Sequence, residues 1–210
     1  ATGPITVAGG LNEWGFRHRL RPGDELDLPE ALLVSVTGDL NTATQRLHDY
    51  RRRWVRPDSD SLVPVQFNTW FGYGPDVHVD RMKAAATGAA ELGSEVFVLD
   101  SGWFTTETDT PVADWWWAMA GDWKVNPALF PNGLQELSSH CQELGMGFGI
   151  WFEAEAVGRD AQIRETHPEW LHAIGGRVTA PEERAILNLG VPAAREWIRE
   201  RILSVLQSTG

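Results

Sequence analysis

Three short apolar segments of this chain each end in side chains that could bind a polar ligand. The first ends in Asn-Thr-Trp at 68–70, the second in Asp-Ser-Gly-Trp at 100–103, and the third in Trp-Phe-Glu-Ala-Glu at 151–155. Each segment supplies an aromatic ring, and two of them also supply carboxylates. A flat ring beside hydrogen-bonding groups suits a sugar, which has apolar C–H faces and a polar rim. Glycine at position 102 would let the backbone turn sharply and approach a ligand closely.

The two glutamates at the end of the third segment could form a catalytic pair. Glu153 and Glu155 are two residues apart, so on a regular strand they would share one face. Two carboxyl groups on one face could act together in acid–base chemistry, which makes the pair a candidate. The alternative is a structural role beside the site, through ion pairing or backbone capping. The residue types alone leave both interpretations open.

The segments that must position these side chains alternate between strand and helix from residue 64 onward. Strands are predicted to end at the three sites above, and helices are predicted over about 76–92, within 132–145 and from Pro192. Glu-Leu-Gly precedes the second strand and recurs before the third. This pattern predicts repeated βα units with parallel strands, whose continuously apolar sequences predict cover on both faces. Chemistry in such folds lies at the carboxyl ends of the strands, so the three sites should converge.

The residues before position 64 have a different pattern. Strands are predicted at 16–20 and 25–28, around an Arg-Pro-Gly-Asp turn, and at 31–36. Apolar residues at helical spacing predict a helix over 40–54, and a polar segment follows it. We therefore divide the chain into residues 1–38, a linker helix and loop over 39–63, and a strand–helix region over 64–210.

The composition limits the kinds of partner and compartment. A formal net charge of −11 argues against nucleic acid, and 42% hydrophobic residues predict a packed core. No apolar run approaches the ~20 residues of a membrane span, and residues 1–10 do not resemble a signal peptide. A cytoplasmic location is compatible with this sequence, which leaves the compartment open.

The remaining composition predicts neither a metal nor a cofactor. The six histidines show no metal-binding spacing, and the glycines form no phosphate-binding motif. The single cysteine, Cys141, lies on the apolar face of a predicted helix and is expected to be buried. Tryptophan is unusually frequent, with 11 residues that include a run at 115–117. Such rings could fill the core or stack on a ligand.

Five motifs, in order, resemble the bacterial α-galactosidases of glycoside hydrolase family thirty-six. They are NTW, FVLDSGWF, GDWKVNPALFPNGL, ELGMGFGIWFEAE and HPEWL, and the resemblance covers about residues 64–207. It implies an α/β fold in which residues 64–210 form the first three βα units of an incomplete (β/α)8 TIM barrel. Residues 1–38 resemble the end of the β-sandwich domain that precedes the barrel in this family.

The resemblance also implies a retaining glycoside hydrolase that removes terminal α-linked galactose from oligosaccharides and forms a homo-oligomer as the full-length protein. The family nucleophile is an aspartate in a Lys-Trp-Asp motif on the fourth strand, and the acid/base follows later. Both would lie beyond Gly210. We therefore expect no catalytic residue in this chain and no activity from it alone. A related α-glycosidase, for example an α-N-acetylgalactosaminidase, and a non-catalytic carbohydrate-binding fragment remain alternatives.

Five residues match family motifs by position. Trp70, Asp100 and Trp151 match residues that bind the sugar. Asp122 and Trp123 match a Gly-Asp-Trp loop, for which we expect a supporting role.

Two further candidates depart from the family pattern. Ser101 stands where the family usually has a second sugar-binding aspartate, and a neutral hydroxyl accepts weaker hydrogen bonds than a carboxylate. Arg184 lies near the position of a sugar-binding arginine, but the surrounding motif is not reproduced. Ser101 therefore leaves the sugar specificity open.

Overall fold

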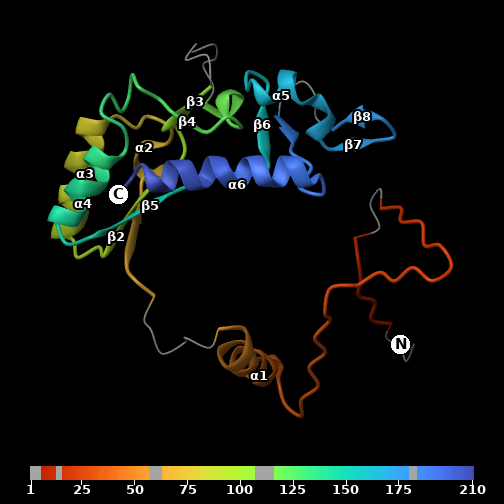
Figure 1. The fold of residues 1–210 in the computed structure, drawn as a ribbon. Helices are drawn as coiled ribbons and strands as arrows, with labels where there is room; N and C mark the ends of the chain where they lie inside the picture. Colours follow the sequence, from red (N-terminus) through yellow and green to blue (C-terminus); the bar gives the residue numbers. More distant parts are fainter. Residues whose placement is uncertain (1–5, 13–15, 57–62, 107–115, 180–183) are drawn as a thin grey trace. The chain divides into compact units, whose positions relative to one another are not determined.

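The computed structural model describes residues 6–12, 16–56, 63–106, 116–179 and 184–210. The chain divides into two compact units, residues 1–63 and 64–210, which are described separately below (Figure 1).

Among the described residues of the N-terminal unit, the regular structure is one helical segment, the helix predicted over 40–54. It consists of α1 (Leu40–Tyr50), which continues into the π-helical segment η1 (Arg51–Val55). Asp39 caps α1 at its N-terminus, because its Oδ1 accepts a hydrogen bond of 2.9 Å from the backbone N–H of Thr42. This bond holds the pKa of the Asp39 carboxyl below its usual value.

The strands predicted at 16–20, 25–28 and 31–36 are not found. Residues 16–36 as described contain a turn, closed by a 3.0 Å hydrogen bond from the Asp24 N–H to the Arg21 carbonyl, but no strand. Their apolar side chains, such as Phe16 and Leu33, are exposed. The described residues of this unit contain no further strand that could pair with this segment, and a lone hairpin is marginal in water, so β propensity alone does not produce strands here.

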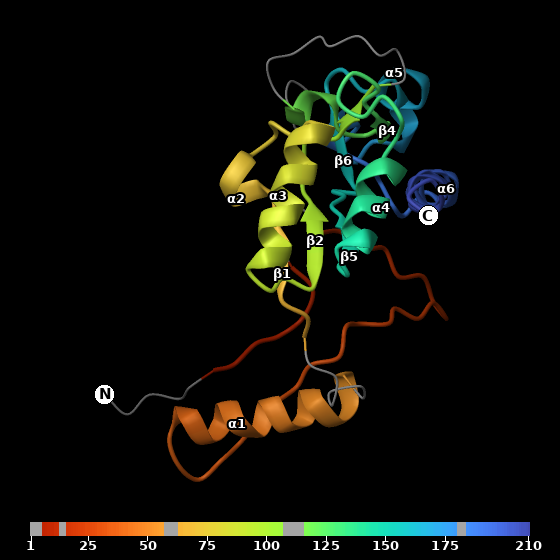
Figure 2. The ribbon, with the colours of Figure 1, turned by 90° about the vertical axis from the view of Figure 1, so that its left-hand side faces the viewer.

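The C-terminal unit is built on a three-stranded parallel sheet, which confirms the α/β class and the parallel strands predicted from the sequence. Its strands are β1 (Gln66–Asn68), β2 (Val96–Leu99) and β5 (Gly147–Ile150), in the order β1-β2-β5. The connecting helices are α3 (Val79–Glu91) and α4 (Gln135–Glu143), and α6 (Pro192–Gln207) follows later. Figures 1 and 2 show α3 and α4 side by side along the sheet, and the two helices contact each other.

The core lies between this sheet and its helices. Phe97 and Leu99 of β2 are fully buried, and Phe67 of β1 stacks on Phe97 with ring centroids 5.7 Å apart. The helices add buried residues to the same core, namely Met82, Ala86, Leu137 and Cys141. Burial raises the pKa of the Cys141 thiol to about 11, since the charged thiolate is disfavoured away from water.

The expectation of cover on both faces of the strands is not met by β2. Phe97 and Leu99 are buried, whereas Val96 and Val98, which alternate with them, are only partly buried. Successive side chains of a strand point to opposite faces, so within the described residues the core covers one face more completely than the other.

Smaller elements, which were not predicted, extend the carboxyl end of the sheet. They are α2 (Trp70–Tyr73), the antiparallel pair β3 (Phe104–Thr105) and β4 (Lys124–Val125), and the 3₁₀ helix η2 (Trp116–Met119). Between β5 and α6 lie β6 (Ala156–Gly158), α5 (Ile163–Thr166), η3 (Pro168–Trp170), β7 (Ala173–Ile174), β8 (Arg177–Val178) and β9 (Arg184–Ile186). In this segment β6 pairs with β9 and β7 pairs with β8, both antiparallel.

None of the helices described is both long and apolar enough to cross a membrane. The described residues also contain no cluster of three or more histidine, cysteine, aspartate or glutamate side chains that could hold a metal ion.

Candidate functional site

A pocket of about 280 Å³ lies at the carboxyl ends of β1, β2 and β5. Trp70, Asp100 and Trp151, the three residues expected to converge, all line it. They come together because parallel strands end at the same edge of the sheet, and each residue follows its strand within two positions. The other lining residues are Asn68, Phe71 and Trp116.

The polar part of the pocket is a hydrogen-bonded pair from neighbouring strands. Asn68 donates from Nδ2 to Oδ2 of Asp100 at 2.7 Å, and its own Oδ1 accepts the Trp70 N–H at 2.8 Å. The second carboxylate oxygen of Asp100 accepts the Ser101 N–H at 2.7 Å. The carboxylate is therefore held in one orientation. An ionised carboxyl has about four acceptor sites, so Asp100 can still accept hydrogen bonds from a ligand.

The apolar part of the pocket is a wall of three indole rings. Trp116 meets Trp70 edge to face with centroids 5.3 Å apart, and it meets Trp151 in the same way at 6.0 Å. Trp103 supports this wall from beneath, since its Nε1 donates to the Trp151 carbonyl at 3.1 Å. Such contacts fix the rings before a ligand arrives, which limits the entropy lost on binding.

Trp123, for which we expected a supporting role, lies behind the wall rather than in the pocket. Its ring is buried, with its centroid 6.2 Å from that of Trp151 and 4.7 Å from that of Phe104. Its backbone φ is +53°, an uncommon conformation for a residue with a side chain. Its Nε1 has no hydrogen-bond partner among the described residues. Trp123 thus packs against the wall of indole rings without lining the pocket.

Asp122 has a structural task at a distance from this pocket. Its carboxylate is buried and accepts hydrogen bonds from the backbone N–H groups of Gln162, at 2.8 Å, and Ile163, at 3.0 Å. These groups open the short helix α5, so Asp122 ties the loop after η2 to the segment after β6. It also borders a separate hollow of about 380 Å³, which is lined by Asp122, Gln162, Ile163, Thr166, His167, Trp197 and Arg201.

Ser101 and Arg184 do not line the pocket. Ser101 is fully buried, and its Oγ has no hydrogen-bond partner among the described residues. Arg184 lies on β9 and forms an ion pair with Glu153, with Nη1 and Oε2 2.6 Å apart. This ion pair favours the structural interpretation for Glu153, whereas Glu155 is exposed. Neither glutamate lines the pocket.

Three lining residues were not named individually as site residues from the sequence. Trp116 belongs to the tryptophan run at 115–117, which was a usable signal, although Trp115 lies outside the described residues. Asn68 stands at the end of β1, directly before Trp70. Phe71 carried no signal, since a single phenylalanine after a strand is more often part of a core.

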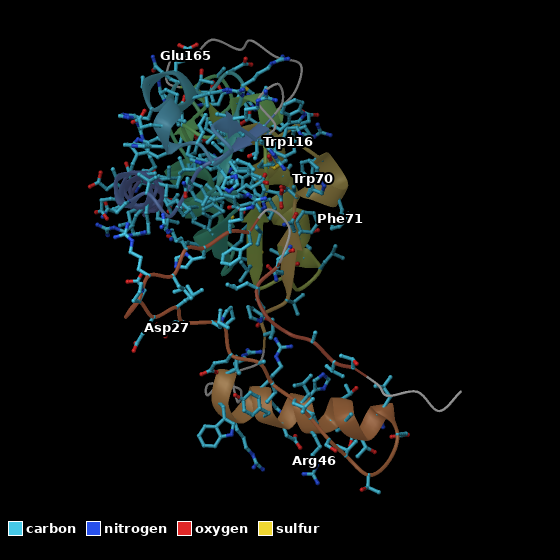
Figure 3. All side chains as sticks on the ribbon, turned by 90° about the vertical axis from the view of Figure 1, so that its right-hand side faces the viewer. Asp27, Arg46, Trp70, Phe71, Trp116 and Glu165 are labelled. Atoms are coloured by element: carbon cyan, nitrogen blue, oxygen red, sulfur yellow. The ribbon has the colours of Figure 1, made fainter. Side chains whose placement is uncertain are left out.

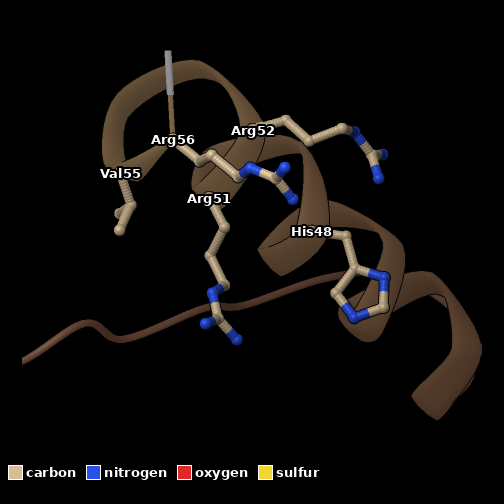
Figure 4. Close-up of a pocket in the computed structure, with 5 residues that line it drawn as sticks. All are labelled: His48, Arg51, Arg52, Val55 and Arg56. Carbon is tan, nitrogen blue, oxygen red and sulfur yellow. The ribbon is translucent and has the colours of Figure 1, made fainter. Parts of the chain in front are cut away.

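A further hollow lies on the N-terminal unit and differs in chemistry. It has a volume of about 290 Å³ and is lined by side chains of one helical segment: His48, Arg51, Arg52, Val55 and Arg56 (Figure 4). Its lining contains arginines and no carboxylate among the described residues. A solvated helix end explains this arrangement, because cations are favoured at a helix C-terminus.

The fold and the pocket together define an α/β protein with a pocket lined by aromatic side chains at the carboxyl ends of its parallel strands. The chain belongs to the melibiase family, whose model matches residues 25–210.

Relatives and solved structures agree with this assignment. The chain is 34% identical to α-galactosidase Mel36A of Lactobacillus acidophilus and 33% identical to α-galactosidase AgaA of Geobacillus stearothermophilus, covering in each case 98% of this chain and 28% of the relative. A crystal structure of a substituted GH36 α-galactosidase AgaA, in complex with stachyose, superposes with a TM-score of 0.78 at 30% identity, covering 95% of this chain and 27% of that one. The resemblance recognised in the motifs is thereby confirmed. The chain spans less than a third of the length of these relatives.

Proposed function

We propose that the pocket binds the terminal galactose of an α-galactoside, as part of the substrate site of a retaining glycoside hydrolase of the α-galactosidase type. The observation that carries the proposal is the oriented Asp100 carboxylate enclosed by Trp70, Trp116 and Trp151. The relatives of this chain are α-galactosidases, and one of them has been crystallised with raffinose.

Each part of the pocket matches one part of a sugar. The Asp100 carboxylate can accept hydrogen bonds from sugar hydroxyls, and charge-assisted bonds of this kind are the strong ones. The indole faces suit the C–H surface of the ring. The Asn68 amide is hydrogen-bonded to the Asp100 carboxylate and to the Trp70 backbone, so its role is to hold that carboxylate in place.

The pocket explains binding better than it explains bond cleavage. A retaining glycosidase needs two carboxyl groups about 5–5.5 Å apart. Of the described residues that line the pocket, only Asp100 carries a carboxylate. We therefore assign Asp100 to substrate binding and place the nucleophile and the acid/base outside this chain. In this proposal β1, β2 and β5 are the first three strands of a (β/α)8 barrel, and residues 1–38 belong to a preceding β-sandwich.

The test is a binding titration of the 210-residue chain with methyl α-galactoside, followed by tryptophan fluorescence. Asp100→Asn removes the charged acceptor and keeps the side-chain shape. Because a hydrogen bond to a charged group contributes about 1.5–3 kcal/mol, affinity should fall roughly tenfold to 150-fold. Asp80→Asn is the matched control, since Asp80 lies exposed in the first turn of α3. Equal affinities for the two variants would contradict the proposal, and turnover by the chain alone would contradict the placement of the catalytic residues.

A related sugar specificity is the second candidate. Ser101 lies buried outside the pocket, so one carboxylate faces the ligand where the family pattern has two. A pocket with a single charged acceptor discriminates less strongly among hydroxyl configurations. Competition between methyl α-galactoside and the corresponding N-acetylgalactosaminide distinguishes the two candidates.

A further inference from the structure

Phe71 is the most solvent-exposed residue of the pocket lining. Its side chain is 96% exposed, although the residue follows Trp70 directly in α2 and borders the same pocket. Figure 3 shows Phe71 at the edge of the C-terminal unit, with Trp70 and Trp116 further in. A ring in this position contributes almost nothing to the core formed by the described residues, so packing against them does not explain why it is there.

The size of the pocket determines what can reach Phe71. Ligand pockets usually enclose about 300–1,000 Å³, and this one, at about 280 Å³, lies just below that range. It has room for one sugar ring and not for a trisaccharide such as raffinose. The remaining rings of an oligosaccharide must then lie outside, at the mouth where Phe71 stands.

The chemistry of Phe71 restricts what it can do there. A phenyl ring neither donates nor accepts conventional hydrogen bonds, so it cannot read hydroxyl groups as Asp100 can. It offers a flat apolar face, which is suited to the C–H surface of a second sugar ring.

The backbone under Phe71 is fixed although the ring is in solvent. The N–H of Tyr73 donates to the Thr69 carbonyl at 2.9 Å, and the N–H of Gly74 donates to the Trp70 carbonyl at 2.8 Å. The Trp70 N–H is held by Asn68, and the Arg81 guanidinium lies over the Tyr73 ring, 4.9 Å from its centroid. A ring on an ordered turn loses little backbone entropy when it binds a ligand.

We propose that Phe71 is a specificity-determining residue that stacks on the sugar adjoining the terminal galactose, so that the site prefers oligosaccharides to simple α-galactosides. This inference rests on the proposed function, because it takes the inner pocket to be the galactose site. It adds the position of the leaving-group sugar and the residue that recognises it.

The experiment compares two ligands on the same chain, methyl α-galactoside and raffinose. Phe71→Ala should weaken raffinose binding roughly threefold to tenfold, as expected for the loss of one stacked ring, and should leave methyl α-galactoside binding unchanged. Phe71→Tyr keeps an aromatic face and should retain the preference. The control is Leu92→Ala, because Leu92 is 84% exposed and lies after α3, at the opposite end of the sheet from the pocket.

The outcomes separate this inference from the function on which it rests. If neither ligand binds the unaltered chain, the proposed function fails and the inference fails with it. If both ligands bind and Phe71→Ala leaves their affinity ratio unchanged, the function stands and the inference is overturned. Phe71→Ala could instead change the oligomeric state, measured by light scattering, while the ratio of the two affinities stays the same. That result would also overturn the inference, and it would identify Phe71 as a self-association contact.

Discussion

Replacing Gly102 with alanine should destabilise the C-terminal unit and disturb its pocket. Gly102 has φ = +107°, in the region where side chains are strained. A Cβ atom at this position would lie 2.4 Å from the carbonyl oxygen of Pro75 and 2.8 Å from its Cα. Both are backbone atoms of the loop after α2, so the clash cannot be relieved by rotating a side chain.

The magnitude follows from two separate costs. A left-handed backbone costs a residue with a Cβ about 1–2 kcal/mol. Forcing packed backbone apart costs a further 1–3 kcal/mol or so. The sum, roughly 2–5 kcal/mol, is a large share of the ~5–15 kcal/mol by which a domain is usually stable. Gly93→Ala is the matched control, because Gly93 has φ = +84° but no heavy atom within 4 Å of the added Cβ. It should show only the first cost.

The assay is urea unfolding of both variants and the unaltered chain, followed by tryptophan fluorescence, with methyl α-galactoside binding as a second measurement. Gly102→Ala should unfold at lower urea than Gly93→Ala, by a free-energy difference of about 1–3 kcal/mol. It should also bind the sugar more weakly, since Gly102 follows Asp100 by two residues. Equal destabilisation by the two substitutions would refute the argument that the Pro75 backbone contacts Gly102.

Three further changes test other parts of the structure. Asp122→Ala should lower stability by about 1–3 kcal/mol, because it leaves the backbone N–H groups of Gln162 and Ile163, the second of them buried, without their acceptor. Faster amide exchange at these two residues would support this prediction, and unchanged exchange would contradict it. Cys141 has its pKa raised in the folded state, so its contribution to stability is complete below its ordinary pKa of about 9 and is lost as pH rises toward about 11. The melting temperature should therefore fall between these pH values, and it should fall less in Cys141→Ala. An identical fall in both proteins would count against this prediction. Ser101→Ala should leave stability nearly unchanged, because the Oγ atom has no hydrogen-bond partner among the described residues. Ser101→Asp should lower stability by several kcal/mol, because it buries a charge beside Asp100. A Ser101→Asp protein as stable in urea as the original would mean that the position is open to solvent.

The parallel sheet and the convergence of Trp70, Asp100 and Trp151 could be predicted from the sequence. Both depend on local patterns, namely apolar runs of strand length and the residues that end them. In a parallel sheet these ends meet at one edge whatever the details of packing. The buried face of α4, with Leu137 and Cys141, was likewise predictable from its spacing, since a helix places such residues on one side.

Other features were decided by contacts between residues far apart in the chain. The backbone turn after Asp100 buries Ser101 instead of directing it to the pocket, and pairing of β6 with β9 brings Arg184 to Glu153. Trp116 lines the pocket from a 3₁₀ helix, which no periodicity in the sequence predicted. The strands expected before residue 38 illustrate the same limit. A strand exists only when a partner satisfies its backbone groups and an apolar surface covers its face, and neither condition can be read from the segment itself.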